Sequence, residues 1–357
     1  MNKKFFFFVF KHRHRVNIFN NLLRVKKIND YKIFNISGPF RYYFFSIFFI
    51  FFVEKFNNFF KNFCLISCDS RPIIRRNGIN IWFGGTSHKI PEIYSNLKNN
   101  CHVFENFVHK EKNLIKFYPT ALDYTKPNKK IKIVFVGDFN FSNHKIVNKI
   151  WKNEKNRIFD DYSIIDKKSF WNKYKLKKDV KTLVYYIGLR DLIRFNTICK
   201  LYKEFKNEML VVGTRWKPYI RSSLDSNYNF QYVKSLYKGN ICIDFGSKWG
   251  SNSLYPRAIN IIESGGILLQ SKQSDTKKIF GKINKDISFN NYNELVKKIN
   301  KLKKNEKILN DLYSNQYKLF NNKNLNYHTL KKIFLISKKN KYVFKKSNET
   351  CTKTSLC

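Results

Sequence analysis

The stretch LYPRAINIIESGGILLQ, from Leu254 to Gln270, combines a helix start, a helix end and a buried strand in one short segment. Pro256 suits the first position of a helix, because it has no backbone N–H to leave unpaired. Gly265 and Gly266 end that helix, and the apolar run ILLQ follows at once. The segment therefore predicts a helix over about 255–264 that turns abruptly into a strand, with its N-terminus close to a ligand.

Short apolar runs alternate with amphipathic helical patterns from about residue 130 onward. Five runs are predicted to be strands: Lys132–Gly137, Leu183–Gly188, Met209–Gly213, Ile241–Gly246 and Ile267–Gln270. Such alternation predicts right-handed crossovers and a parallel, doubly wound sheet. Glycines at the carboxyl ends of the strands would let a backbone approach a ligand closely, although ordinary turns explain them equally well.

Two helices are predicted between and after these strands. One follows the second predicted strand, with apolar residues at helical spacing: Leu192, Phe195, Ile198, Cys199, Tyr202 and Phe205. The other opens with Asn291 as N-cap and Glu294 at the third helical position. Its predicted buried stripe is Leu295, Val296, Ile299 and Leu302.

The composition predicts a folded, strongly basic chain. The 357 residues include 69 Lys+Arg against 25 Asp+Glu, for a formal charge of +44. Such a charge suits nucleic acid, anionic lipid or phosphorylated partners, but codon bias towards A/T also explains it, because Lys, Asn, Ile, Phe and Tyr are over-used together. The seven cysteines include no CxxC pair, which favours a reducing cytoplasm and indicates neither a zinc site nor a disulfide framework.

Three regions are expected along the chain: an N-terminal domain over 1–125, a second domain over 126–336 and a basic tail over 337–357. The Phe-rich run over 42–53 is uncharged but falls short of the ~20 residues needed to span a bilayer. It is interpreted either as a buried helix or inter-domain surface, or as a patch lying in a membrane interface beside basic residues. The run INIWFGG, from Ile79, predicts a strand and a turn.

The first turn of the helix over 255–264 has the features of an anion site. Ser251 or Ser253 is expected to cap it, and Arg257 lies within it. Unpaired N–H groups, the positive end of the helix dipole and a guanidinium converge there, as the binding of a diphosphate requires.

These residues resemble a known family. LYKGNICIDFGSKWGSNSLYPRAINIIESGGILLQ is similar to the donor-binding core of GT-B glycosyltransferases, particularly the spore-maturation (CgeB-like) group, and to the C-terminal domain of group 1 glycosyltransferases. YYIGLRDLIRFNTICKLYKEFKNEMLVVGTRWK before it and FGKINKDISFNNYNELVKKINKLKKNEK after it extend the resemblance over about residues 180–335. The resemblance implies an α/β, GT-B-like fold: a Rossmann-type doubly wound sheet in the C-terminal domain, with a smaller N-terminal α/β domain, complete or reduced.

The resemblance also implies the transfer of a sugar from a nucleotide-sugar donor to a glycan or lipid-linked acceptor in cell-surface polysaccharide synthesis. No cofactor is expected beyond the nucleotide-sugar substrate, and the absence of any Asp-x-Asp sequence favours a metal-independent enzyme. The expected location is the cytoplasm, with peripheral contact to the inner membrane face left open. The competing class is a non-catalytic basic protein that binds nucleic acid or an anionic membrane, but no nucleic-acid motif supports it.

The candidate residues follow from these arguments. The donor-binding candidates are Gly188, Arg190, Gly213, Arg215, Lys217, Ser253, Tyr255, Pro256, Arg257, Asn260 and Glu263. The candidates for a general base in an inverting reaction are His88, Asp69 and Asp123.

Two points in this assignment stay open. The family's ribose-binding carboxylate falls on Asn260 here, and Glu263, one helical turn later, could replace it. For Arg190 and Arg194, a solvent-facing role competes with donor binding. Arg257→Ala is expected to weaken nucleotide binding and to leave the fold largely intact.

Overall fold

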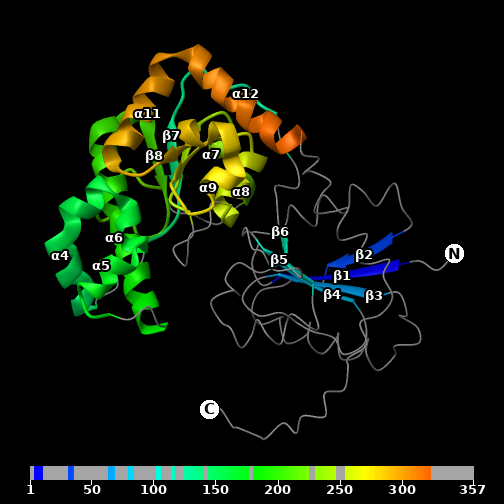
Figure 1. Cartoon of the computed structure of the whole chain (residues 1–357). Coiled ribbons are helices and arrows are strands. Elements are labelled where there is room, and N and C mark those ends of the chain that lie inside the picture. Colours follow the sequence, from blue (N-terminus) through cyan, green and yellow to red (C-terminus); the bar gives the residue numbers. More distant parts are fainter. Residues whose placement is uncertain are drawn as a thin grey trace, which may run out of the picture. The chain divides into compact units, whose positions relative to one another are not determined.

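The structure is a computed structural model, in which two compact units can be distinguished. It describes residues 4–10, 31–35, 63–68, 79–83, 102–105, 114–116, 122, 124–139, 144–176, 180–224, 230–246 and 254–322. The larger unit covers Glu105–Lys331, and the smaller one centres on Leu22–Phe104 (Figure 1).

The N-terminal strands form a six-stranded sheet. They are β1 (Lys4–Phe10), β2 (Tyr31–Asn35), β3 (Phe63–Cys68), β4 (Ile79–Phe83), β5 (His102–Glu105) and β6 (Leu114–Lys116), in the order β2-β1-β3-β4-β5-β6. The pairs β1–β2, β1–β3, β3–β4 and β4–β5 are parallel. Near-continuous apolar runs such as that of β1 are typical of strands in such sheets. The strand predicted from Ile79 is confirmed as β4.

The second unit contains a five-stranded sheet, which confirms the predicted parallel α/β fold. Its strands are β7 (Ile133–Val136), β8 (Met209–Val212), β9 (Ile241–Asp244), β10 (Ile267–Ser271) and β11 (Ser288–Phe289). The order is β11-β10-β9-β7-β8, and all four neighbouring pairs are parallel. Every residue of β9 and β10 is buried, so both faces of the sheet are covered.

One predicted strand is wrong. Residues 183–188 belong to α6 (Val180–Phe205), a single helix of 26 residues. A short apolar run bounded by glycine fits a buried helix segment as well as a strand, and the helical pattern downstream continues back through it. Gly188, predicted to end a strand, is buried inside this helix.

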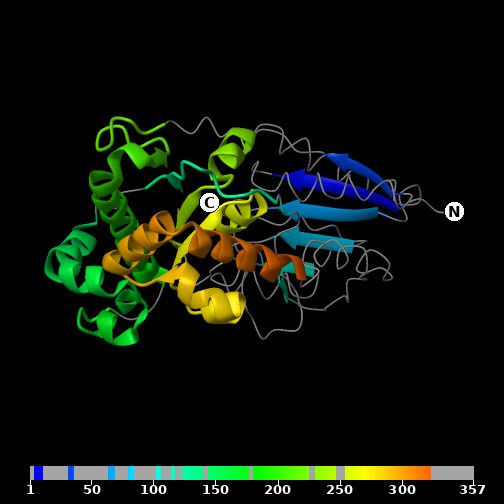
Figure 2. The ribbon, with the colours of Figure 1, turned by 90° about the horizontal axis from the view of Figure 1, so that it is seen from above.

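The remaining helices follow the strands in turn (Figure 2). They are α4 (Lys145–Asp160), α5 (Lys168–Asn172), α7 (Phe230–Tyr237), α8 (Pro256–Glu263), α9 (Thr276–Phe280), α10 (Asn284–Ile287), α11 (Tyr292–Lys304) and α12 (Glu306–Asn322). α7 contacts α8 and β7. α11 is tied to α6 by a hydrogen bond from the Tyr292 hydroxyl to Glu204 Oε2 of 2.7 Å.

The predicted helix of the opening stretch is confirmed as α8, including its end. Gly266 N donates to Ile261 O at 2.9 Å and Gly265 N to Ile262 O at 3.2 Å, with φ of Gly265 at +72°. This is the Schellman pattern, which places one residue in the left-handed conformation. Glycine adopts that conformation at the lowest energetic cost, because it has no Cβ. At the other end the N-cap is Tyr255, which makes no side-chain capping bond. The serines predicted to cap the helix lie outside the described residues.

The strand β9 carries a buried free thiol in the centre of the sheet. Cys242 is 0% exposed, and its Sγ donates to Asn240 O at 3.3 Å. Burial raises the pKa of this thiol well above its ordinary value. Cys242 therefore serves as a small apolar core residue.

No helix in the described parts of the chain combines the length and the apolar character that a bilayer crossing requires. The Phe-rich run over 42–53 lies outside those parts.

The predicted N-cap of α11, Asn291, is confirmed and yields a stability prediction. Asn291 Oδ1 accepts from Glu294 N at 2.8 Å, and Glu294 Oε2 accepts from Asn290 N at 2.7 Å. Asn291→Ala removes one of these acceptors, so we expect the free energy of unfolding to fall by about 1 kcal/mol in urea titrations. Lys297→Ala, an exposed change inside the same helix, is the control. Equal midpoints for the two variants would contradict the prediction.

Candidate functional site

The order of the second sheet creates a topological switch point between β7 and β9. The chain leaves β7 towards β8 at one edge, whereas β9 leads through β10 to β11 at the other. Sheets of this order, 2-1-3-4-5 in chain sequence, bind ligands outside the carboxyl ends of the strands at that point. Gly137 follows β7 there, and Asp244 is the last residue of β9.

Arg257, in the first turn of α8, lies at this switch point and is held by an ion pair. Its Nη1 donates to Asp244 Oδ1 at 2.9 Å. The side chain of Asp244 is 0% exposed and that of Arg257 is 16% exposed. A carboxylate this buried requires a partner, and Arg257 supplies the charge.

The second oxygen of Asp244 is also satisfied. Oδ2 accepts from Gly246 N at 3.0 Å and from Gln270 Nε2 at 2.9 Å. Burial opposes the charge on Arg257, but Asp244 outweighs it, so the pKa of Arg257 is raised and the guanidinium stays ionised. The guanidinium thus has a fixed orientation in the structure.

The wall around this guanidinium is built by β7. The Arg257 Cζ lies 5.6 Å from the centroid of the Phe135 ring, within cation–π range. A Cβ placed on Gly137 would lie 2.7 Å from Arg257 Nη2. Glycine is therefore required at position 137 for the guanidinium to approach the backbone.

A second buried pair lies in α6. Arg194 Nη2 donates to Asp191 Oδ1, and the two side chains are 7% and 2% exposed. The pKa of Arg194 is lowered by burial first, partly offset by Asp191, and Arg257, Asp244 and Tyr255 also act on it. Two arginines and two aspartates are thus electrostatically coupled at this end of the sheet.

Arg190 also lies inside the protein, so the solvent-facing interpretation of Arg190 and Arg194 is wrong. Arg190 Nη2 donates to both oxygens of Asp166 and to Gln273 Oε1, each at 3.3 Å. Gln273 Nε2 in turn donates to Phe245 O at 3.2 Å. Arg190 therefore links α6 to the turns after β9 and β10, which is a structural role.

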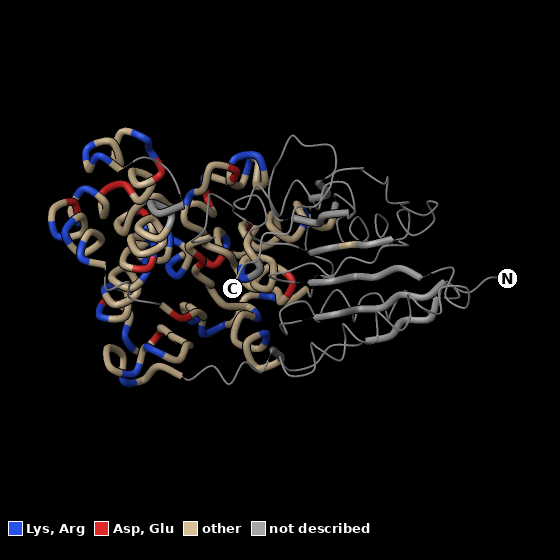
Figure 3. Tube along the Cα trace, turned by 90° about the horizontal axis from the view of Figure 1, so that it is seen from below, with Lys and Arg blue, Asp and Glu red and all other residues tan. Residues whose placement is uncertain are grey.

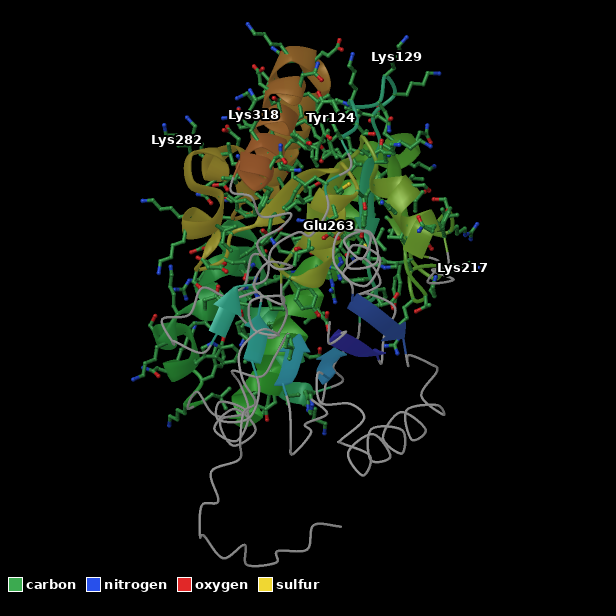
Figure 4. The ribbon with its side chains drawn as sticks, turned by 90° about the vertical axis from the view of Figure 1, so that its right-hand side faces the viewer. Tyr124, Lys129, Lys217, Glu263, Lys282 and Lys318 are labelled. Atoms are coloured by element: carbon green, nitrogen blue, oxygen red, sulfur yellow. The ribbon has the colours of Figure 1, made fainter. Side chains whose placement is uncertain are left out.

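The turn after β8 brings Gly213 and an aromatic cluster to the same edge. Thr214 N donates to Asp138 Oδ1 at 2.7 Å, and Trp216 Nε1 donates to Gly137 O at 2.7 Å. Arg215 and Lys217 are exposed on this turn, and Figure 4 shows Lys217 at the periphery of the unit.

The contact between Gly213 and Gly137 predicts a steric effect. A Cβ on Gly213 would lie 2.7 Å from both Gly137 O and Asp138 Oδ1. We expect Gly213→Ala to lower the free energy of unfolding by about 1–3 kcal/mol, measured in urea. Lys206→Ala, an exposed change shortly before β8, is the control. A smaller loss for Gly213→Ala than for the control would contradict the steric explanation.

The two candidates for the ribose contact lie further along α8. At 1.5 Å per residue, Asn260 is roughly 4.5 Å and Glu263 roughly 9 Å along the axis from Arg257. Glu263 is buried at 3% exposure. Asn260 therefore lies nearer to Arg257 along the helix axis than Glu263 does.

The other candidates divide into two groups. Tyr255 and Pro256 lie beside Arg257 at the start of α8. Outside the described residues lie Ser253, His88, Asp69 and Asp123. Sequence reasoning missed Asp244, although a carboxylate ending a fully apolar strand is a signal for a buried, paired charge.

Basic residues are spread over the second unit. In the view of Figure 3, Lys and Arg occur along most of the helices, with Asp and Glu between them. Among the residues that the structure describes, no three His, Cys, Asp or Glu side chains come together in a way that would hold a metal ion.

Comparisons with known proteins give one distant similarity. No family model matches the chain, and a search of curated proteins finds no relative. The chain is similar to a solved structure described as T4 phage BGT in complex with UDP and Mn2+. The identity is 11%, the alignment covers 93% of this chain and 97% of that chain, and the TM-score is 0.45. A similarity this weak supports no conclusion about activity.

Proposed function

We propose that the chain is a GT-B type glycosyltransferase that transfers a sugar from a nucleotide-sugar donor to a glycan or lipid-linked acceptor. The observation that carries the proposal is Arg257, in the first turn of α8 at the β7–β9 switch point, with its guanidinium oriented by Asp244. The sequence resemblance of residues 180–335 to the CgeB-like group supports the same assignment. Cell-surface polysaccharide synthesis is the role that this resemblance suggests.

In the proposed reaction, the bond between the anomeric carbon and the diphosphate oxygen breaks, and the nucleoside diphosphate leaves with the electron pair. The acceptor hydroxyl forms the new glycosidic bond. Its proton passes to a base of the enzyme if configuration is inverted, or to the leaving phosphate if it is retained. Arg257 and the N–H groups of the first turn of α8 stabilise the charge that develops on the diphosphate.

The roles of the remaining candidates follow from their positions. Asn260 is proposed to bind the ribose, because it lies closer to Arg257 than Glu263 does. His88, Asp69 and Asp123 remain the proposed bases. Charge stabilisation by protein groups rather than by a metal is proposed because no Asp-x-Asp sequence occurs in the chain.

The experiment is a panel of UDP-, GDP-, ADP- and dTDP-sugars incubated with the full chain. The readout is release of the nucleoside diphosphate by hydrolysis, in which water takes the place of the acceptor hydroxyl. We expect release from one donor class, and the same rate with and without EDTA. Release that EDTA abolishes would overturn metal independence alone. If the chain releases no nucleoside diphosphate and binds no donor in calorimetry, the proposed function is overturned. The basic binding protein is then the alternative.

A further inference from the structure

Tyr219 is the exposed member of an aromatic cluster in which Phe139 and Trp216 are buried and Phe195 is half-buried. It is 53% exposed, whereas Phe139 is 3% and Trp216 0% exposed. The ring meets Phe195 edge-on at 4.7 Å and Phe139 at 5.8 Å between centroids. A large ring that packs against other rings and is still about half exposed offers a surface to a planar ligand.

The turn that carries this ring is firmly tied. Tyr219 N donates to Trp216 O at 2.9 Å. At the base of the turn, Gly213 N donates to Leu224 O and Leu224 N to Val211 O, both at 2.9 Å. The ring is therefore held in place before any ligand arrives, and binding to it costs little ordering of the protein.

Two contacts connect the cluster to Arg257. Trp216 Nε1 donates to Gly137 O at 2.7 Å, and the Cα of Gly137 faces the Arg257 guanidinium. Exposed cations accompany Tyr219 on the same turn: Arg215, Lys217 and Arg221. An aromatic surface among cations, next to a site for a diphosphate, matches the two halves of a nucleotide.

We propose that Tyr219 stacks on the base of the nucleotide donor whose diphosphate Arg257 binds. This inference rests on the proposed function and adds a residue that the sequence did not single out. Because every base has a π-face, stacking of this kind accepts different bases and explains affinity rather than the choice of base.

The test is calorimetric titration of UDP, GDP and ADP into the full chain. The nucleotide that binds most tightly is then titrated into each variant. We expect Tyr219→Ala to weaken that nucleotide about tenfold to a hundredfold. Tyr219→Phe keeps the ring and should stay within about twofold of wild type. Inorganic pyrophosphate, which has no base, should bind all three proteins equally.

Tyr219→Leu serves as a second variant, because it keeps an apolar contact with Phe195 but removes the aromatic face. Unchanged nucleotide binding by Tyr219→Ala or Tyr219→Leu would overturn the inference and leave the proposed function standing. An equal loss for pyrophosphate would also overturn it, because the effect would then not involve the base. A wild-type chain that binds none of the nucleotides would overturn the proposed function, and the inference with it.

Discussion

Arg257→Ala should lower the free energy of unfolding by about 3 kcal/mol, at the lower end of the cost of breaking a buried ion pair. The variant leaves Asp244 at 0% exposure without its counter-charge, while the hydrogen bonds from Gly246 and Gln270 remain. This differs from the expectation from sequence, that the fold would be largely intact, because the burial of Asp244 was not visible there. Urea titration measures the change.

A matched pair of variants separates folding from binding. Asp244→Asn combined with Arg257→Ala removes the buried charge and keeps an acceptor for Gly246 N, so we expect it to be more stable than Arg257→Ala alone. It should still bind nucleoside diphosphate more weakly than wild type. Lys152→Ala, which removes an exposed positive charge from α4, is the charge-matched control. If the free energy of unfolding of Arg257→Ala lies within about 1 kcal/mol of the wild-type value, the proposed importance of the Arg257–Asp244 ion pair is contradicted.

Trp216→Ala should cost about 3–5 kcal/mol, the range for removing a fully buried aromatic side chain. The indole is 0% exposed, stacks on Phe195 at 5.8 Å and meets Phe139 at 4.6 Å. Its loss also leaves Gly137 O without the donor that Trp216 Nε1 provides. Urea titration gives the loss directly.

Trp216→Phe is the informative companion, since it keeps most of the ring and removes the N–H. We expect it to fall between wild type and Trp216→Ala. Should Trp216→Ala unfold at the same urea concentration as wild type, the cluster would not be part of the cooperative core.

The sequence predicted the second sheet well because its strands alternate with helical patterns and three of them, β7, β8 and β9, are followed by glycines. Strands β7, β8, β9 and β10 follow from those signals. The two errors have physical reasons. Residues 183–188 are β-branched and aromatic enough to resemble a strand, yet they lie inside a helix whose packing overrides local propensity. β11 has only the residues Ser288 and Phe289, too few for a periodic signal.

The candidate site was predictable in position but not in detail. The glycines and Arg257 placed it at the carboxyl ends of the strands. The pairing of Arg257 with Asp244 and the burial of Arg190 and Arg194 depend on contacts between elements far apart in the chain. Spacing within one element cannot supply such information, because tertiary packing decides which charges meet.

The buried thiol of Cys242 allows the opening of the sheet around β9 to be measured by chemical labelling. Its sulfur is shielded in the native state and its raised pKa disfavours the reactive thiolate, so alkylating reagents reach it only through an opening. When the sheet recloses faster than the reagent reacts, the labelling rate reports the equilibrium population of the open form. The ratio of this rate to that of an unfolded peptide, followed by mass spectrometry, gives the free energy of opening. Cys199, which is only partly buried, should be labelled faster. Comparing the two rates with and without a nucleoside diphosphate would reveal ligand binding as slower labelling, without any assay of sugar transfer.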